Sequence, residues 1–157
     1  MMKLSINREF LLRHLGVCLL MFGLAGWFGY DGFVTYPQTE AAKLYESIER
    51  SAPPEGCNLE AFKRQKIQTQ YGFAALSLVA ALAIGLHLLL VARLRLEYDD
   101  TGFSWNGKKH AFAEISAVDR SEWGKGKKGV LILTVGGRKL KLDAWHHAGV
   151  AEFAERI

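Results

Sequence analysis

One stretch of the chain, Tyr71 to Ala92, runs for 22 residues without a formal charge. As a helix it would be about 33 Å long, at about 1.5 Å of rise per residue, which is enough to cross a bilayer. The next six residues, Arg93 to Tyr98, alternate charged and apolar side chains, and such alternation is typical of a β-strand. The sequence therefore predicts a membrane helix joined almost directly to a small folded domain.

A second apolar block, residues 15–36, lies earlier in the chain, and Asp31 near one end is its single charged residue. The segment after the Tyr71–Ala92 run, residues 93–157, is ordinary and polar, and it is close to the lower size limit for a domain with its own core. We therefore predict a membrane α-helical hairpin of two transmembrane helices, 15–36 and 71–92, followed by a small α+β domain.

The distribution of basic residues predicts how such a hairpin is oriented, because Lys and Arg concentrate on the cytoplasmic side. Residues 1–14 hold three of them and residues 93–157 hold twelve, whereas residues 37–70 hold five, matched by five glutamates. We expect a multi-pass protein with both termini in the cytoplasm and the 37–70 loop outside. The first apolar run is long for a secretory signal and lacks a convincing cleavage site, which favours an uncleaved anchor.

The loop between the two apolar blocks has helical patterns of its own. Pro37 suits the first turn of a helix, and the break at residues 51–56 ends it. Asn58 is a plausible N-cap for a helix that then continues without interruption to Ala92. Apolar residues follow helical spacing in the first part of the loop, at Ala41, Leu44, Tyr45 and Ile48.

The chain has two cysteines, and their positions predict no disulfide between them. Cys18 lies inside the first span and Cys57 in the loop, near the opposite side of the membrane. No cysteine spacing typical of a metal site is present. Cys57 either remains a thiol or pairs with another chain.

Small residues recur along both predicted spans, and small residues let transmembrane helices approach closely. Two interpretations follow: the two helices pack on each other as a hairpin, or one small-residue face docks onto a larger membrane partner. The candidate helix-packing residues are Gly23, Gly26, Gly29, Gly32, Ala74, Ala81 and Gly85.

The pattern of the C-terminal segment predicts short strands followed by one helix. Asn106-Gly107 is a strong hairpin signal between two of these strands, and Gly136-Gly137 predicts another tight turn. A closing helix is expected to begin near Asp143 or Ala144 and to bury Val150, Phe153 and Ile157. The predicted strands cover about residues 93–98, 103–105, 109–112, 116–122, 130–135 and 138–142.

This order of strands, turns and closing helix resembles that of the bacterial PH-like domains found on small membrane proteins. The likeness lies in Tyr98-Asp-Asp-Thr-Gly-Phe103, Phe112-Ala-Glu-Ile115, Val130-Leu-Ile-Leu133, Gly136-Gly137 and Leu140-Lys-Leu142. It covers about sixty residues and implies a bent antiparallel sheet capped by a C-terminal helix, with a binding or assembly role at the inner membrane. The segment is short for such a barrel, so one strand is expected to be missing or borrowed from a partner.

Side chains that could carry chemistry are few. His14 and His87 both fall toward the cytoplasmic side of the spans, and paired imidazoles can hold a haem or a metal. His146 and His147 are adjacent and would point in different directions on a helix, so joint chelation is not expected. The sequence shows no catalytic constellation, no metal-site spacing and no basic recognition helix for nucleic acid, and we expect a non-catalytic protein without cofactors.

The glycine-rich segment 124–129 carries three lysines, Lys125, Lys127 and Lys128. It is either a solvated hairpin tip or a contact with anionic lipid headgroups, which attract basic loops close to a membrane. The leading hypothesis is an accessory subunit or assembly factor of a larger membrane complex. The alternative is a membrane-surface module that senses anionic lipid through these lysines.

Overall fold

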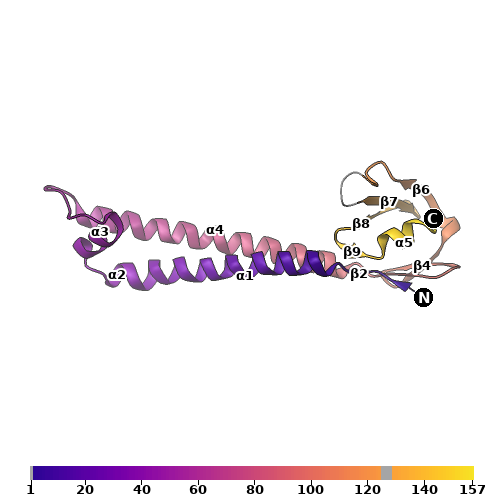
Figure 1. Ribbon diagram of the computed structural model, residues 1–157, viewed down its shortest axis with the longest axis horizontal. Coiled ribbons are helices and arrows are strands. Elements are labelled where there is room, and N and C mark those ends of the chain that lie inside the picture. The colour runs from indigo at the N-terminus through magenta and orange to yellow at the C-terminus, as the bar shows by residue number, and fades with distance from the viewer. Residues whose placement is uncertain (1, 125–128) are drawn as a thin grey trace. The chain divides into compact units, whose positions relative to one another are not determined.

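The computed structural model describes residues 2–124 and 129–157, which form two compact units (Figure 1). One unit, called here the helical unit, covers Gly16–Gly85. The other, called the sheet unit, combines Met1–Leu15 with Leu86–Ile157. The two ends of the chain therefore belong to the same folded body, although the two predicted spans lie between them in the sequence.

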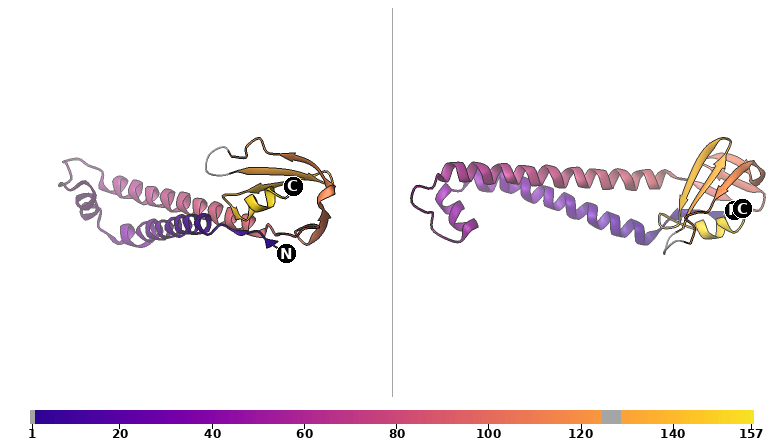
Figure 2. Two further views of the ribbon diagram at one scale, coloured as in Figure 1. Left: turned by 45° about the vertical axis from the view of Figure 1, so that its right-hand side comes forward. Right: turned by 90° about the horizontal axis from the view of Figure 1, so that it is seen from above.

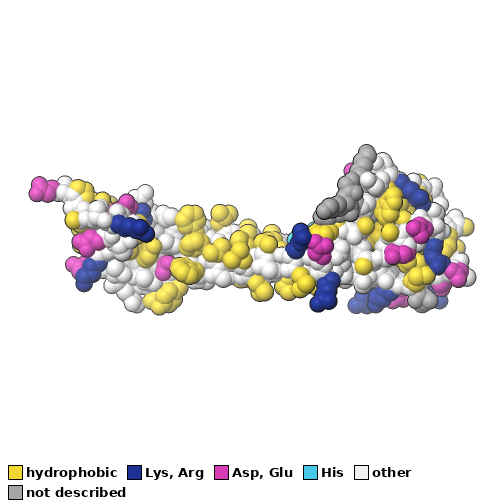
Figure 3. Space-filling view, viewed as in Figure 1, with side chains coloured by type: hydrophobic (Ala, Val, Ile, Leu, Met, Phe, Trp, Pro, Cys, Tyr) yellow, Lys and Arg dark blue, Asp and Glu magenta, His cyan; other side chains and the backbone are white. Residues whose placement is uncertain are grey.

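Two long helices run through the chain: α1 (Arg8–Tyr30) and α4 (Leu59–Arg93). With the short segments that extend α1 to Gln38, both are long and apolar enough to cross a membrane. Only 11% and 17% of their most apolar stretches are buried, unlike the core helices of a soluble protein, which are mostly buried. Figure 3 shows hydrophobic side chains on the surface of these helices.

The end of the first long helix changes its winding. A π-helical stretch, η1 (Asp31–Thr35), follows α1 and leads into α2 (Tyr36–Gln38). The indole N–H of Trp27 donates a hydrogen bond of 2.9 Å to the Asp31 carboxylate. This bond gives the charged residue a partner within its own helix.

The loop between the long helices is folded, as the sequence predicts. Asn58 caps α4, because its side-chain oxygen accepts a 3.0 Å hydrogen bond from the backbone N–H of Ala61. The first loop helix, α3 (Ala41–Glu49), begins later than Pro37, which lies in α2 instead. The Lys63 ammonium donates to the carbonyl oxygens of Pro37, at 2.9 Å, and Thr39, at 2.7 Å. These bonds give partners to two carbonyl groups between α2 and α3, and they hold this part of the loop against α4.

The sheet unit contains antiparallel strands in three groups. A four-stranded sheet has the order β1-β3-β4-β5, a three-stranded sheet the order β6-β7-β8, and β2 pairs with β9. Asn106 and Gly107 both have positive φ, of 49° and 85°, in the turn between β4 and β5. The strands are β1 (Met2–Lys3), β2 (Ser5–Ile6), β3 (Leu96–Tyr98), β4 (Gly102–Trp105), β5 (Lys108–Ala111), β6 (Ile115–Asp119), β7 (Val130–Val135), β8 (Arg138–Asp143) and β9 (His147–Ala148).

The N-terminus supplies two strands that local sequence patterns did not predict. Met2 pairs with Tyr98, and Lys3 with Glu97, so that β1 extends the sheet beyond β3. Leu4 is 3% exposed and belongs to the core of the sheet unit. We expected one strand to be missing or borrowed from a partner, whereas the chain's own first residues provide an extra strand.

The closing helix starts later than expected. We predicted a start near Asp143 or Ala144, but α5 covers Val150–Ala154. Strand β8 continues to Asp143, whose backbone and side-chain oxygens accept hydrogen bonds from the N–H groups of His146 and Trp145. The chain therefore turns at this point and forms β9 before the helix begins.

One hydrophobic core holds the sheet unit together. It joins the inward faces of the strands to the buried side of α5, which lies against the sheets in both views of Figure 2. The short helix contributes Val150, Phe153 and Ala154 to this core. Its other members are Leu4, between β1 and β2, and the strand residues Leu96, Tyr98, Phe103, Leu131, Leu133, Val135, Leu140 and Leu142.

Candidate functional site

A cluster of aromatic and imidazole rings lies in the sheet unit, where α1 starts and α4 ends. Phe10 is 1% exposed and forms its centre. The ring centroids of His14, His146, His87 and Trp145 lie 4.1, 4.6, 6.0 and 6.2 Å from that of Phe10. The rings thus tie two helices to the turn after β8.

The two histidines singled out from the sequence, His14 and His87, belong to this cluster. Their ring centroids are 6.1 Å apart. The Nδ1 atom of His14 lies 2.9 Å from the carbonyl oxygen of Phe10, four residues earlier in the same helix. Within residues 2–124 and 129–157, no three His, Cys, Asp or Glu side chains are grouped so that they could hold a metal ion.

The adjacent histidines lie in different elements: His146 ends the turn after β8, and His147 begins β9. His146 packs on Phe10, whereas His147 is 4% exposed and lies within 3.1 Å of the Val91 carbonyl oxygen through Nε2. The Nδ1 atom of His147 is buried without a partner among the described residues. Both histidines join the site, although the sequence suggested only His14 and His87.

Burial lowers the pKa of both adjacent histidines. For His146, the Asp143 carboxylate opposes this effect, and charge on neighbouring histidines adds to it. For His147, the hydrogen bond to Val91 and the charge of Asp143 oppose the effect of burial. The folded protein therefore favours the neutral form of both rings.

The small residues of the predicted spans divide into two groups. Ala81 is fully buried and its carbonyl oxygen accepts a 3.4 Å hydrogen bond from the Cys18 thiol. A Cβ placed on Gly32 would lie 2.8 Å from a ring carbon of Tyr71, and one on Gly85 would lie 3.8 Å from the Cys18 sulfur. These positions face the other helix of the hairpin, and Ala74 is half-buried.

The other group forms what we call the open glycine face: Gly16, Gly23, Gly26 and Gly29 of α1. Beyond their own stretch of helix, a Cβ at any of these positions would meet no described atom within 4 Å. The hairpin therefore does not use this face.

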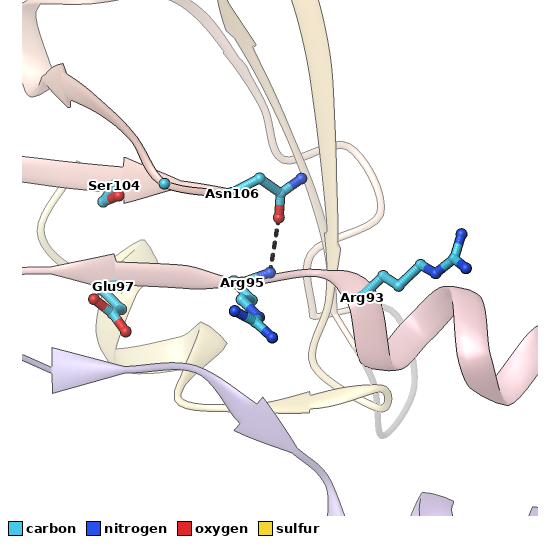
Figure 4. Close-up of a pocket in the computed structure, with 6 residues that line it drawn as sticks. Arg93, Arg95, Glu97, Ser104 and Asn106 are labelled. Carbon is cyan, nitrogen blue, oxygen red and sulfur yellow. Dashed lines mark hydrogen bonds between the residues drawn. The ribbon is translucent and has the colours of Figure 1, made fainter.

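The lysines Lys125, Lys127 and Lys128 lie outside the described residues. Other basic side chains stand at the end of α4, where Arg93 and Arg95 line a shallow cavity of about 320 Å³ with Glu97 and Asn106. Figure 4 shows the two arginine side chains pointing in different directions. Neither guanidinium group has a hydrogen bond or ion pair with the part of the chain that the structure describes.

Several acidic side chains of the sheet unit have structural partners. Hydrogen bonds from the hydroxyl and backbone N–H of Thr101, with another from Gly102, lower the pKa of Asp99 and fix the turn before β4. Hydrogen bonds from His110 and the Ala111 N–H lower the pKa of Glu114. These carboxylates stabilise turns.

Comparison with protein-family models, with curated proteins and with solved structures finds no match to this chain. The resemblance to PH-like domains therefore rests on the sequence pattern alone.

Proposed function

We propose that this chain is a non-catalytic membrane protein that acts as an accessory subunit or assembly factor of a larger membrane complex. The observation that carries the proposal is the open glycine face of α1. Glycines on a transmembrane helix let a second helix approach closely, and the hairpin leaves four of them without a neighbour. A helix of another membrane protein fits this face.

The proposed membrane insertion is supported by the exposure of the long helices. Their surfaces carry large apolar side chains, such as Leu19, Trp27 and Leu76, which are 62%, 69% and 67% exposed. Exposed apolar surface on this scale marks a membrane or partner contact. With the distribution of Lys and Arg, it leads to a multi-pass protein of the inner membrane whose termini are both cytoplasmic.

The sheet unit is proposed to be a PH-like domain that contacts partner proteins on the cytoplasmic side. The order of elements supports this interpretation, because paired antiparallel strands precede a short helix that fills their core. Strand β1, supplied by the N-terminus, makes up for the short C-terminal segment.

The experiment replaces Gly26 and Gly29 by leucine in the full chain and measures photo-crosslinking from position 22, on the same side of α1. We expect a specific crosslinked partner with the native glycines and its loss in the double variant. The matched control places leucine at Ala75 and Ala83, two exposed alanines of α4, and should retain the partner. A homogeneous lone protein in mild detergent, or crosslinking that survives both glycine changes, would contradict the proposal.

A second candidate function is contact with anionic lipid. The specific observation is that the guanidinium groups of Arg93 and Arg95 have no partner among the described residues and stand at the end of a helix long enough to span a bilayer. Basic groups next to an anionic leaflet gain about 1 kcal/mol each. Because their side chains diverge, each would contact a separate lipid phosphate (Figure 4).

Lipid retention in native mass spectrometry tests this candidate with two variants. Changing Arg93 and Arg95 to glutamine should reduce retained anionic lipid, while changing Lys125, Lys127 and Lys128 to serine tests the basic loop separately. Equal retention by both variants and the native chain would reject the lipid function.

A further inference from the structure

Four of the five histidines of the chain meet in one place, although they come from three separate segments. His14 lies in α1, His87 in α4, and His146 and His147 follow β8. Successive ring centroids are 6.1 Å apart for His14 and His87, 5.4 Å for His87 and His146, and 6.4 Å for His146 and His147. All four lie within the sheet unit, which includes the start of α1 and the end of α4.

The charged groups around the cluster offer little compensation for added positive charge. The Asp143 carboxylate lies 3.8 Å from Nδ1 of His146. The Arg13 guanidinium lies 5.7 Å from the centroid of Trp145, and Glu9 is already paired with Arg13 at 2.6 Å. Among the residues that the structure describes, Asp143 is the carboxylate that contacts these imidazoles, while Glu9 compensates the charge of Arg13.

The cluster holds the N-terminal segment to the rest of the sheet unit. Ile6 pairs with His147 in the β2–β9 ladder, and the backbone N–H of Asn7 donates 2.8 Å to the carbonyl oxygen of His146. His147 reaches the last turns of α4 through the Val91 carbonyl oxygen. The same two histidines thus carry the backbone contacts of β2 and sit among the other imidazoles.

We propose that His14, His87, His146 and His147 form a proton-sensitive latch, which holds the N-terminal segment in the sheet unit at neutral pH and releases it in acid. Protonation would place positive charge on rings whose successive centroids lie 5.4 to 6.4 Å apart, beside the buried ring of Phe10. Release would uncover the edge of β3 and the core position of Leu4. An uncovered strand edge can pair with another strand.

The direction of the pH effect follows from burial. The pKa values of His146 and His147 are lower in the folded protein than the ordinary value of 6.5, so the folded state binds protons less readily than the open state. The stabilisation is complete above the ordinary value and is lost as the pH falls below it. The latch should therefore be closed at pH 7.5 and weakened at pH 5.5.

Hydrogen exchange of the full chain in nanodiscs tests the latch. We expect exchange of residues 2–15, corrected for the intrinsic effect of pH, to rise about threefold or more between pH 7.5 and 5.5. Exchange in β7 and β8 should change much less. The variant H14Q/H87Q/H146N should lose most of this difference, whereas H110N, which changes the histidine outside the cluster, should keep it.

Two results would overturn the proposal. One is unchanged corrected exchange of residues 2–15 in the native chain over this pH range, and the other is a full acid effect in a folded triple variant. If the triple variant loses protection from exchange in β7 and β8 at neutral pH, the variant is not folded. The pH titration of the histidine NMR signals in the native chain then tests the latch. Titration of His146 and His147 below the ordinary value of 6.5 supports the latch, and titration of both at the ordinary value contradicts it.

Discussion

The two units place the same kind of side chain in opposite surroundings. In the sheet unit, Leu131 and Leu142 are completely buried, whereas Leu19 and Leu76 of the helical unit are 62% and 67% exposed. A chain that folds only in water would not favour the second arrangement, because exposed apolar area costs about 25 cal/mol per Å². The difference supports the proposal that the helices lie in lipid or against a protein partner, whereas the sheet unit buries its apolar side chains in a core of its own.

Truncation of a buried aromatic in the sheet unit gives the largest contrast between the units. Phe153→Ala removes a fully buried ring from the core and should destabilise the sheet unit by about 3–5 kcal/mol. Leu76→Ala, on the exposed helix surface, should change stability by less than about 0.5 kcal/mol. Denaturant unfolding in mild detergent measures both, and similar losses would contradict this contrast between the units.

The N-terminal strand should matter to the sheet unit despite its distance in sequence. Leu4→Ala is expected to cost about 2–3 kcal/mol, because Leu4 fills the core beside residues from the other end of the chain. Met2→Ala, at a side chain that is 44% exposed, serves as the matched control. Thermal unfolding followed by tryptophan fluorescence checks the difference. A neutral Leu4→Ala would show that the strand is dispensable.

Within the helical unit, substitution of Gly32 should lower stability, whereas substitution of Gly26 should not. Gly32→Ala forces a Cβ into the Tyr71 ring and should cost about 1–3 kcal/mol through overpacking. Gly26→Ala meets open space and should be within about 0.5 kcal/mol of neutral. Titration with a denaturing detergent, monitored by helicity, measures both variants. Equal effects would mean that the hairpin does use the open glycine face.

The smallest expected effect concerns the start of α4. Asn58→Ala removes the oxygen that caps the helix and should cost about 1 kcal/mol. Asn58→Asp keeps a capping oxygen and should be nearly neutral. Hydrogen exchange of the first turn of α4 is the sensitive measurement, and identical exchange in both variants would argue against the cap.

Local patterns in the sequence predicted most elements of the fold. The uncharged run ending at Ala92, the Asn58 cap and the Asn106-Gly107 turn each depend on neighbouring residues, and the structure has the expected helix, cap and hairpin. Helices and antiparallel sheets are both present, whereas the PH-like fold stays a prediction. The predicted start of the closing helix, near Asp143 or Ala144, was wrong because Asp143 ends a strand and begins a turn.

Contacts between distant segments could not be predicted in the same way. Residues 2–6 show a weak alternation in which Leu4 and Ile6 are apolar, but nothing local indicates that they pair with β3 and β9. The histidine cluster also required the fold, because His146 reaches the other rings only through the turn that replaced the expected helix. The recurrence of glycines in α1 can be read from the sequence. Which of them the other helix of the hairpin leaves open could be seen only in the structure.

Both long helices are proposed to cross a membrane, with the sheet unit on its cytoplasmic side. Thiol labelling in intact cells with a membrane-impermeant maleimide tests this proposal most directly, using the native Cys57 of the loop in a C18A background. A second variant moves the thiol to exposed strand β6, as C18A/C57A/S116C. We predict that Cys57 reacts in intact cells and that the β6 thiol reacts only after the membrane is permeabilised. Labelling of the β6 thiol in intact cells, or protection of Cys57 until lysis, would contradict the account.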